Sequence, residues 1–244
     1  LRALSAEELL EAQMAIQASA DAGIDGTVVT RSTLEAIADR AADGVPLITG
    51  YNHDEGTLFS GLIPEMVYGM VGPLIAQATI DGADPSEYIE RLKAAFPEDS
   101  KREHFERIWT NMFRRASILA SEQATAEGAG GWLYRFDLRT EQKLGDVVLG
   151  ATHASEIPFT FNIFAKPNYS GAMFHDKNDP VVKRLAEQWS NTIIAFARTG
   201  NPNGAGLPEW PRYSAKNRRS LILDANPRIE MDVDVEYFEL WGDE

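Results

Sequence analysis

"VPLITGYNHDEG", residues 45–56, joins a short apolar run to a cluster of polar residues and a glycine. The run contains the β-branched residues Val45, Ile48 and Thr49 and is bounded by turn signals, which predicts a buried strand. The segment before it, "TLEAIADRAADG" (residues 33–44), has the capping residues and spacing of a helix. A helix followed by a largely apolar strand is typical of a parallel sheet covered by helices. The stretch therefore predicts an α/β fold.

The rest of the chain extends this pattern with few strands and many helices. Further strands are expected in "GWLYRFDL" (131–138) and "SLILDA" (220–225). Helices are expected over 1–20, 102–124, from Pro180 to Gly200 and in the closing "VEYFELWGDE" (235–244), and residues 61–125 are mostly helical. Three strands are few for 244 residues, and the edges of such a sheet would be unpaired. We therefore expect part of a domain.

The composition narrows the classes of protein. The 37 acidic against 23 basic residues give a formal net charge of -14, which argues against nucleic-acid partners and against anionic membranes. The chain has no Cys, which excludes disulfides, thiolate nucleophiles and Cys-based metal sites. The absence of Cys slightly favours a reducing compartment such as the cytoplasm. With 44% hydrophobic residues, the chain can build a sizeable core.

Glu55 is the first candidate for chemistry. It follows the predicted strand of residues 45–52, and the carboxyl ends of strands in open α/β sheets are where catalytic groups lie. Gly56 would let the backbone turn sharply, so that the carboxylate could point into a site. The alternative is a solvated carboxylate in a turn. His53 and Asp54 have the same alternative, and nothing in their pattern favours a catalytic role.

His153 is the second candidate and lies in "GATHASEIPFTFN", residues 150–162. It follows a predicted strand, and Glu55 precedes it, which is the order of acid and base in α/β-hydrolases. The acid would orient the ring, and the histidine would take the proton of a nucleophile and pass it to the leaving group. The alternative is a surface or structural histidine held by hydrogen bonds.

No serine in the chain has the Gly-x-Ser-x-Gly frame of a nucleophile. Ser60 and Ser170 lack the first glycine and follow Glu55. The glycines of "EGAGGW" (residues 127–132) stand just before a predicted strand and are interpreted as a turn between helix and strand. The chain therefore has a candidate acid and base but neither a nucleophile nor an oxyanion hole.

These segments resemble the type-B carboxylesterase/cholinesterase family of the α/β-hydrolase superfamily. The resemblance is carried by "PLITGYNHDEGTLF" (46–59), "GATHASEIPFTF" (150–161) and "IIAFARTGNPN…LPEWPRY" (193–213). "LRALSAEELLEAQ" (1–13) is similar to a helix of the para-nitrobenzyl-esterase-like branch. The resemblance implies that residues 1–244 are the C-terminal half of one α/β-hydrolase domain. It further implies a mostly parallel sheet, with a helical region at about 61–125 that covers the site.

The resemblance also implies roles for individual residues. Glu55 matches the triad acid and His153 the triad base, while Glu156 matches a carboxylate that supports the histidine loop by hydrogen bonding. Phe159 and Phe161 match an aromatic pair that either walls the substrate gorge or packs in the core. The expected framework and core positions are Phe164, Asn203, Trp210, Pro211 and Ile193, the last standing where the family usually has Trp.

The implied function is serine-dependent hydrolysis of carboxylic esters through an acyl-enzyme, with no metal or organic cofactor. An N-terminal half, as a nicked or separate chain or as part of a longer product, would supply the serine and the oxyanion hole; a stand-alone chain is the third alternative. A carbamate or amide hydrolase is the enzymatic alternative, because the same groups can attack those bonds. The alternative outside enzymes is a non-catalytic cholinesterase-like binding protein. The acyl and alcohol pockets would be built jointly with the other half.

Overall fold

The computed structural model describes residues 4–15, 23–80, 84–165 and 174–242. The chain forms two compact units, residues 1–36 and 37–244. In the first unit, α1 (Ala6–Ala15) begins at the capping box expected there, because the backbone N–H of Glu8 donates to Ser5 Oγ and that of Ser5 donates to Glu8 Oε2. The rest of the helix expected over 1–20 lies outside the described residues. Helix α2 (Thr33–Ala42) spans the boundary between the units.

A four-stranded sheet with the order β1-β2-β5-β6 is the centre of the second unit. The strands β1 (Leu47–Asn52), β2 (Gly131–Phe136) and β5 (Arg219–Leu223) are parallel, and β6 (Arg228–Met231) is antiparallel to β5. The three expected strands are thus confirmed. Within the described ranges β1 pairs with β2 alone, so its other edge is open.

Three further strands were not expected from the sequence. The strand β6 has only four residues, and β3 (Thr140–Leu144) and β4 (Val147–Gly150) form a separate antiparallel hairpin. β3 reads TEQKL, with three consecutive exposed polar residues, so neither an apolar run nor a clean alternation marks it. The hairpin lies between β2 and His153, and it carries the chain back toward the end of β1.

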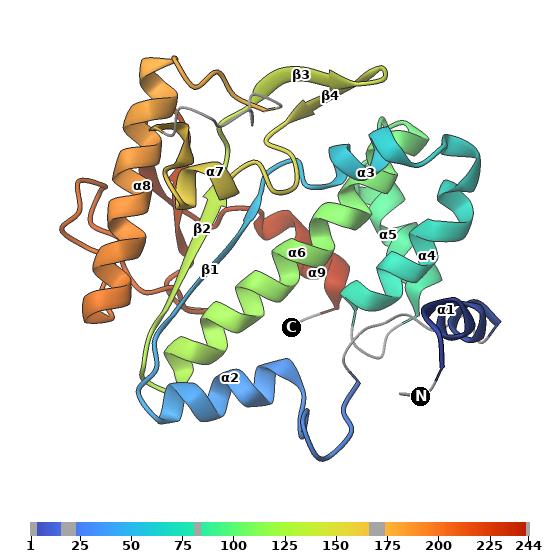
Figure 1. Cartoon of the computed structure of the whole chain (residues 1–244), viewed down its shortest axis with the longest axis horizontal. Coiled ribbons are helices and arrows are strands. Elements are labelled where there is room, and N and C mark those ends of the chain that lie inside the picture. The colour runs from blue at the N-terminus through green and yellow to red at the C-terminus, as the bar shows by residue number, and fades with distance from the viewer. Residues whose placement is uncertain (1–3, 16–22, 81–83, 166–173, 243–244) are drawn as a thin grey trace. The chain divides into compact units, whose positions relative to one another are not determined.

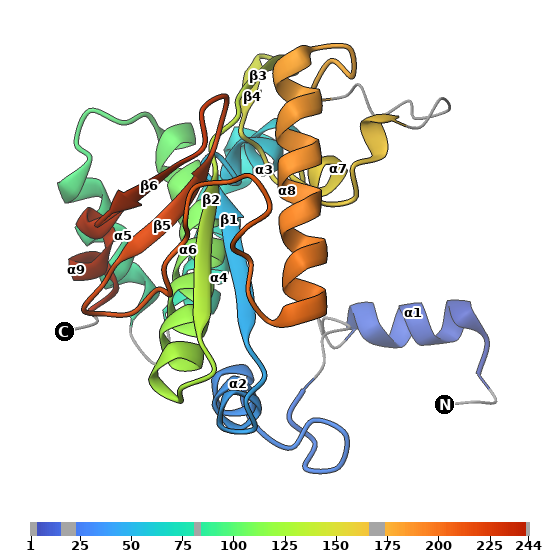
Figure 2. The same cartoon turned by 90° about the vertical axis from the view of Figure 1, so that its left-hand side faces the viewer.

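Helices cover both faces of the sheet (Figures 1 and 2). The 26-residue helix α6 (Lys101–Ala126) lies on one face and α8 (Pro180–Thr199) on the other. Residues of β2 alternate accordingly: Leu133 packs in the core on the α6 face, whereas Trp132 and Phe136 pack in the core on the α8 face. The arrangement is the three-layer α/β architecture that the sequence predicts.

The remaining helical segments are short and surround these layers. They are α3 (Gly56–Leu62), η1 (Glu65–Val67), α4 (Tyr68–Thr79), α5 (Pro85–Ala95), α7 (Ile157–Thr160), η2 (Ile163–Ala165), η3 (Val235–Tyr237) and α9 (Phe238–Trp241). The helical character expected over 61–125 is present in the described part of that range. The closing helix is confirmed but begins with a 3-10 turn.

The ends of α8 follow local sequence signals. The side chain of Asp179 accepts a hydrogen bond from the N–H of Val181, Pro180 occupies the first helical position, and Gly200 ends the helix at φ 72°.

The framework residues lie close to this helix. Phe164 and Trp210 are buried in the core on its face, Ile193 packs against that core, and the Asn203 amide bonds the backbone of Trp210 in both directions.

A buried charge network joins the C-terminal segment to the sheet. Asp234 accepts hydrogen bonds from Tyr51 Oη at 2.7 Å, from Arg114 Nε at 2.9 Å and from an Arg135 guanidinium nitrogen at 2.9 Å. Burial acts to raise the pKa of Asp234, but the charges of Arg114 and Arg135 outweigh burial and hold that pKa well below its ordinary range. The network ties β1, β2 and α6 to the segment before η3.

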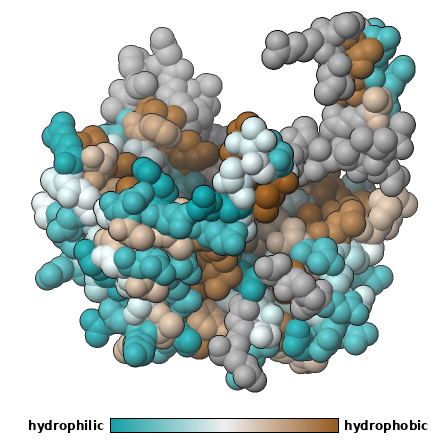
Figure 3. All heavy atoms as spheres, turned by 90° about the horizontal axis from the view of Figure 1, so that it is seen from below, coloured by the Kyte–Doolittle hydropathy of each residue, from teal (hydrophilic) through white to brown (hydrophobic). Residues whose placement is uncertain are grey.

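The visible surface in the space-filling view is mostly hydrophilic, with apolar patches between the charged residues (Figure 3). Within the described ranges no single helix is long and apolar enough to cross a membrane. Helix α3 and the segment of η1 and α4 pass that test only as a pair, bent by 108°.

We predict that Asp234→Asn strongly destabilises the fold, by about 3–5 kcal/mol, because the buried Arg114 guanidinium loses its counter-charge and Arg135 keeps only Asp137. The matched control is Asp232→Asn: Asp232 also has a positive φ (55° against 62°), but it is exposed. The control is expected to change stability by no more than about 0.5 kcal/mol. Urea unfolding followed by circular dichroism measures both, and equal midpoints would contradict the prediction.

The pH dependence has a defined sign. Because the folded-state pKa of Asp234 is depressed, its contribution is complete above the unfolded-state pKa of about 3.9 and is lost as the pH falls below it. The difference in stability between wild type and Asp234→Asn should therefore shrink below about pH 4.

Candidate active site

Glu55 lies at the carboxyl end of β1, where it precedes α3. Its carboxylate is buried, with 5% of the side chain exposed, and Oε1 accepts the backbone N–H of Asn52 at 2.8 Å. Gly56 allows α3 to begin directly against α6, because a Cβ there would lie 2.1 Å from the carbonyl oxygen of Glu106. The sequence-based alternative of a solvated turn carboxylate does not describe this side chain.

His153 follows the β3–β4 hairpin, and its ring meets Glu55. Nδ1 lies 2.6 Å from Glu55 Oε2, and 36% of the histidine side chain is exposed. An ionised carboxylate only accepts hydrogen bonds, so Nδ1 carries the hydrogen and donates it. In the neutral ring Nε2 then holds the free lone pair. Among the described residues, the ring of His153 has no hydrogen-bond partner other than Glu55.

The environment of His153 makes it a stronger base. The hydrogen bond to Glu55 raises the pKa of His153 and outweighs its partial burial, and the charges of Glu55 and Glu156 act in the same direction. The pair therefore favours the imidazolium. This is the state that a histidine adopts after taking a proton from a nucleophile.

Asn52 connects the loop of the acid with the loop of the base. Its backbone N–H bonds Glu55, while its side-chain amide donates to the carbonyl oxygen of Thr152 at 2.7 Å and to Glu156 Oε2 at 2.6 Å. One buried residue at the end of β1 thus holds both partners of the Glu55–His153 pair. The sequence pattern did not single out this residue.

Asp54 makes a second connection between the two loops. Its backbone N–H donates to the carbonyl oxygen of Ala151 at 2.9 Å, and its Oδ2 accepts the N–H of Ala151 at 2.8 Å. Burial acts to raise the pKa of Asp54, but hydrogen bonds from His53 and Ala151 and the charge of Arg139 outweigh it and lower that pKa. His53 Nδ1 lies 2.7 Å from Asp54 Oδ1, and among the described residues the hydrogen bond of Glu55 to a histidine is with His153.

Glu156 lies three residues beyond His153 and is bonded by Asn52. Burial raises its pKa, even though the hydrogen bond from Asn52 acts in the other direction. The supporting role expected of Glu156 fits these contacts and stays a prediction.

The two phenylalanines expected near the substrate have different surroundings. Phe159 is fully buried and packs against Phe136 and Phe164, which corresponds to the core alternative for this residue. Phe161 is 69% exposed. In the described part of the chain the rings that lie against His153 are those of other residues, and a substrate contact stays a prediction for both phenylalanines.

Other aromatic rings, which the sequence did not single out, do lie against His153. The ring centroid of Phe113 is 4.8 Å and that of Phe59 is 5.2 Å from the imidazole, and Trp109 stacks on Phe59 at 3.8 Å. Phe113 and Trp109 come from α6, and Phe59 comes from α3. Helical spacing marked this part of α6 as amphipathic, but only the fold brings its rings to the histidine.

Within the described ranges, no serine is hydrogen-bonded to the ring of His153. The hydroxyl of Ser60 is bonded to Glu106 and to the carbonyl oxygen of Thr57, and Ser170 lies outside the described residues. The glycine turn 127–131 lies at the amino end of β2, whereas Glu55 lies at the carboxyl end of β1 beside it. In the part of the chain that the structure describes, no group of three or more His, Asp or Glu residues is placed to hold a metal ion.

A parallel sheet with helices on both faces, and a buried glutamate after one strand paired to a loop histidine, define an α/β-hydrolase fold. Comparison with solved structures shows the same fold. The crystal structure of the Geobacillus stearothermophilus carboxylesterase EST55 matches with a TM-score of 0.72 and 30% identity. The match covers 98% of this chain and 49% of the EST55 chain. A structure of PNB esterase matches with a TM-score of 0.73 and 25% identity.

The model of the Carboxylesterase family matches residues 1–241, so the chain belongs to this family. It is 31% identical over 252 residues to para-nitrobenzyl esterase of Bacillus subtilis (strain 168), covering 97% of this chain and 47% of that protein. Phenmedipham hydrolase of Pseudarthrobacter oxydans is 27% identical, covering 86% of this chain and 41% of that protein. The chain thus spans about half the length of the curated relatives it matches.

We predict that Glu55→Gln lowers the pKa of His153, because the hydrogen bond to Glu55 is the largest cause of the raised value. Histidine NMR titration measures the pKa directly and does not depend on activity. Glu156→Gln is the matched control, since the charge of Glu156 acts on His153 without a hydrogen bond, and a smaller decrease is expected. An unchanged pKa in Glu55→Gln would show that the pair does not form.

The same shift predicts a direction for stability. A raised folded-state pKa means that the pair stabilises the fold below the ordinary histidine pKa of about 6.5. This contribution is lost as the pH rises through the folded-state pKa of His153.

Proposed function

We propose that this chain supplies the acid and the base of a Ser–His–Glu triad in a carboxylic ester hydrolase, and that the nucleophilic serine lies outside residues 1–244. The observation that carries the proposal is the 2.6 Å contact between His153 Nδ1 and the buried Glu55 carboxylate. This contact orients the ring and leaves Nε2 without a partner among the described residues. Membership of the carboxylesterase family supports an ester as the substrate.

In this mechanism the serine oxygen attacks the ester carbonyl carbon while Nε2 of His153 takes the serine proton. The tetrahedral intermediate collapses, the bond from carbon to the alcohol oxygen breaks, and His153 returns the proton to the leaving alcohol. Water then attacks the acyl-enzyme, with His153 again removing and returning a proton, and the carboxylic acid is released. Glu55 stays ionised and stabilises the imidazolium in both halves of the reaction.

The open edge of β1 is a position where the missing half of the site could join the sheet. The open edge of β1 can accept a further strand, and a parallel strand there would end beside Glu55. We propose that an N-terminal half of the same domain, in a separate chain or in a longer polypeptide, supplies that strand, the serine and the backbone N–H groups that bind the oxyanion. No organic cofactor or metal is needed for these steps.

The helical region at about 61–125 is proposed to cover the site. The contacts of Phe113 with His153 and of Trp109 with Phe59 support this assignment, because both residues belong to α6 within that region. These rings would form an apolar wall beside the reacting carbonyl.

A carbamate is the second candidate substrate class, and the similarity to a relative named phenmedipham hydrolase favours it. A serine can attack the carbonyl carbon of a carbamate or amide through the same three groups. Turnover of an ester, a carbamate and an amide that share one acyl and one leaving-group skeleton separates these reactions.

We predict that His153→Ala, in the natural polypeptide that contains residues 1–244, lowers kcat/KM for a para-nitrophenyl ester by several orders of magnitude. His53→Gln is the matched histidine control, because its ring bonds Asp54 and not Glu55, and a loss below about tenfold is expected. If both variants keep wild-type activity, the proposed base is wrong. If the protein has no hydrolase activity, and the His153→Ala and His53→Gln variants bind a macromolecular partner equally well, the chain is part of a binding protein.

A further inference from the structure

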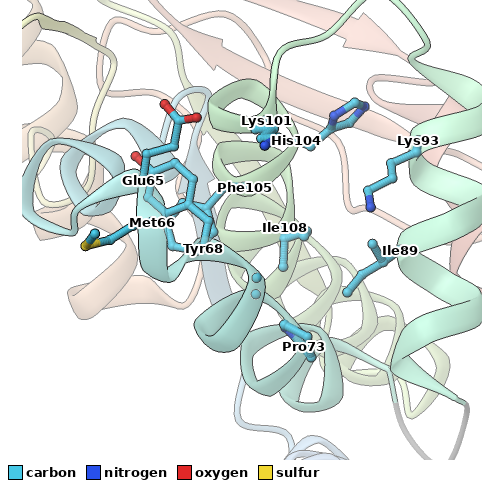
Figure 4. Close-up of a pocket in the computed structure, with 12 residues that line it drawn as sticks. Glu65, Met66, Tyr68, Pro73, Ile89, Lys93, Lys101, His104, Phe105 and Ile108 are labelled. Carbon is cyan, nitrogen blue, oxygen red and sulfur yellow. The ribbon is translucent and has the colours of Figure 1, made fainter.

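A cavity away from the Glu55–His153 pair lies between α4, α5 and the first turns of α6, and Figure 4 shows its lining. Its volume of 680 Å³ is in the range of small-molecule sites. All of its lining residues lie between Glu65 and Ile108, so neither Glu55 nor His153 takes part. Its apolar wall consists of Met66, Tyr68, Pro73, Ile89, Phe105 and Ile108.

Two glycines of α4 keep this cavity open. Gly69 and Gly72 line it, and Gly is the least favourable residue in a helix interior after Pro. A Cβ at Gly69 would meet nothing within 4 Å, and one at Gly72 would lie at ordinary contact distances of 3.6 Å and 3.9 Å from Ile108 and Phe105. Tight packing does not require glycine at either position. The missing side chains leave space that a ligand can occupy.

The charges on the rim are unbalanced. Lys93 and Lys101 line the cavity and have no ion-pair or hydrogen-bond partner among the described residues. Both lysines are exposed, in a chain whose net charge is -14. The single lining carboxylate, Glu65, lies at the opposite end of the pocket from Lys93 in Figure 4. His104 also lines the cavity, and its Nε2 donates a hydrogen bond of 2.9 Å to the carbonyl oxygen of Phe96.

We propose that this pocket binds an alkyl carboxylate. The carboxylate lies between the ammonium groups of Lys93 and Lys101, and the alkyl chain lies in the space beside Gly72, Ile89 and Ile108. The lysines provide charge-assisted hydrogen bonds to the carboxylate, and the apolar wall removes the chain from water.

The pocket is separated from the Glu55–His153 pair by aromatic rings. The ring of Phe105 stacks on that of Tyr68 on the pocket side, with centroids 3.9 Å apart, and forms an edge-to-face pair with Trp109, with centroids 6.4 Å apart. Trp109 in turn stacks on Phe59, which contacts His153. Occupation of the pocket therefore leaves the imidazole uncovered. The inference does not depend on the proposed hydrolase activity.

Octanoate is the probe, and calorimetric titration is the measurement, on the natural polypeptide that contains residues 1–244. Octanol and octyltrimethylammonium carry the same chain without the negative charge. We expect octanoate to bind at least about tenfold more tightly than either. Absence of octanoate binding, or equal affinity for octanoate and octyltrimethylammonium, would overturn the proposal.

Two kinds of variant separate the charge from the cavity. Lys93→Glu combined with Lys101→Glu should weaken octanoate binding at least about tenfold and leave octanol binding unchanged. Gly72→Leu fills the pocket and should weaken both ligands, and its helix should be at least as stable because Leu is a better helix former. Lys183→Glu combined with Lys216→Glu is the charge-matched control at two exposed lysines outside the pocket. Octanoate affinity that stays unchanged in folded Gly72→Leu would place the ligand elsewhere.

Discussion

The parallel pairing of β1 with β2 is the constraint on which the candidate site depends. The register that pairs Leu47 with Gly131 and Asn52 with Phe136 brings both strands to an end at the same edge of the sheet. The hairpin β3–β4 then returns the chain, and one backbone hydrogen bond and one bond to the Asp54 carboxylate connect Asp54 with Ala151, which joins the loop of Glu55 to the segment before His153. The 2.6 Å contact of Glu55 with His153 is therefore held by the backbone as well as by the two side chains.

Helix α6 has three functions along its length. Arg114 anchors it to β2 and to the C-terminal segment through Asp234. Phe113 lies directly against His153, and Trp109 stacks on Phe59, which lies against His153 as well. Phe105 and Ile108 line the cavity between α4, α5 and α6. A single helix thus separates the acid–base pair from a pocket with a different chemical character.

The sequence was most informative where local signals are strong. The apolar run before Glu55, the caps of α1 and α8 and the order of Glu55 and His153 all follow from residue type and spacing, and the family was evident from the segments around them. The polar, exposed strand β3 and the short strands β4 and β6 gave no such signal. Asn52, Phe59 and Phe113 could not be assigned either, because their importance comes from contacts across about 40 to 100 residues of chain that only the fold brings together.

The central claim is that His153 serves a nucleophile outside residues 1–244. The most direct test is to label the natural protein with a fluorophosphonate probe, which reacts with activated serines, and to locate the label by intact-mass and peptide analysis. The account predicts one labelled serine on a separate or longer polypeptide, and loss of that label in His153→Ala. A label on a serine within residues 1–244 such as Ser60, or a labelled serine that does not respond to His153→Ala, would contradict it.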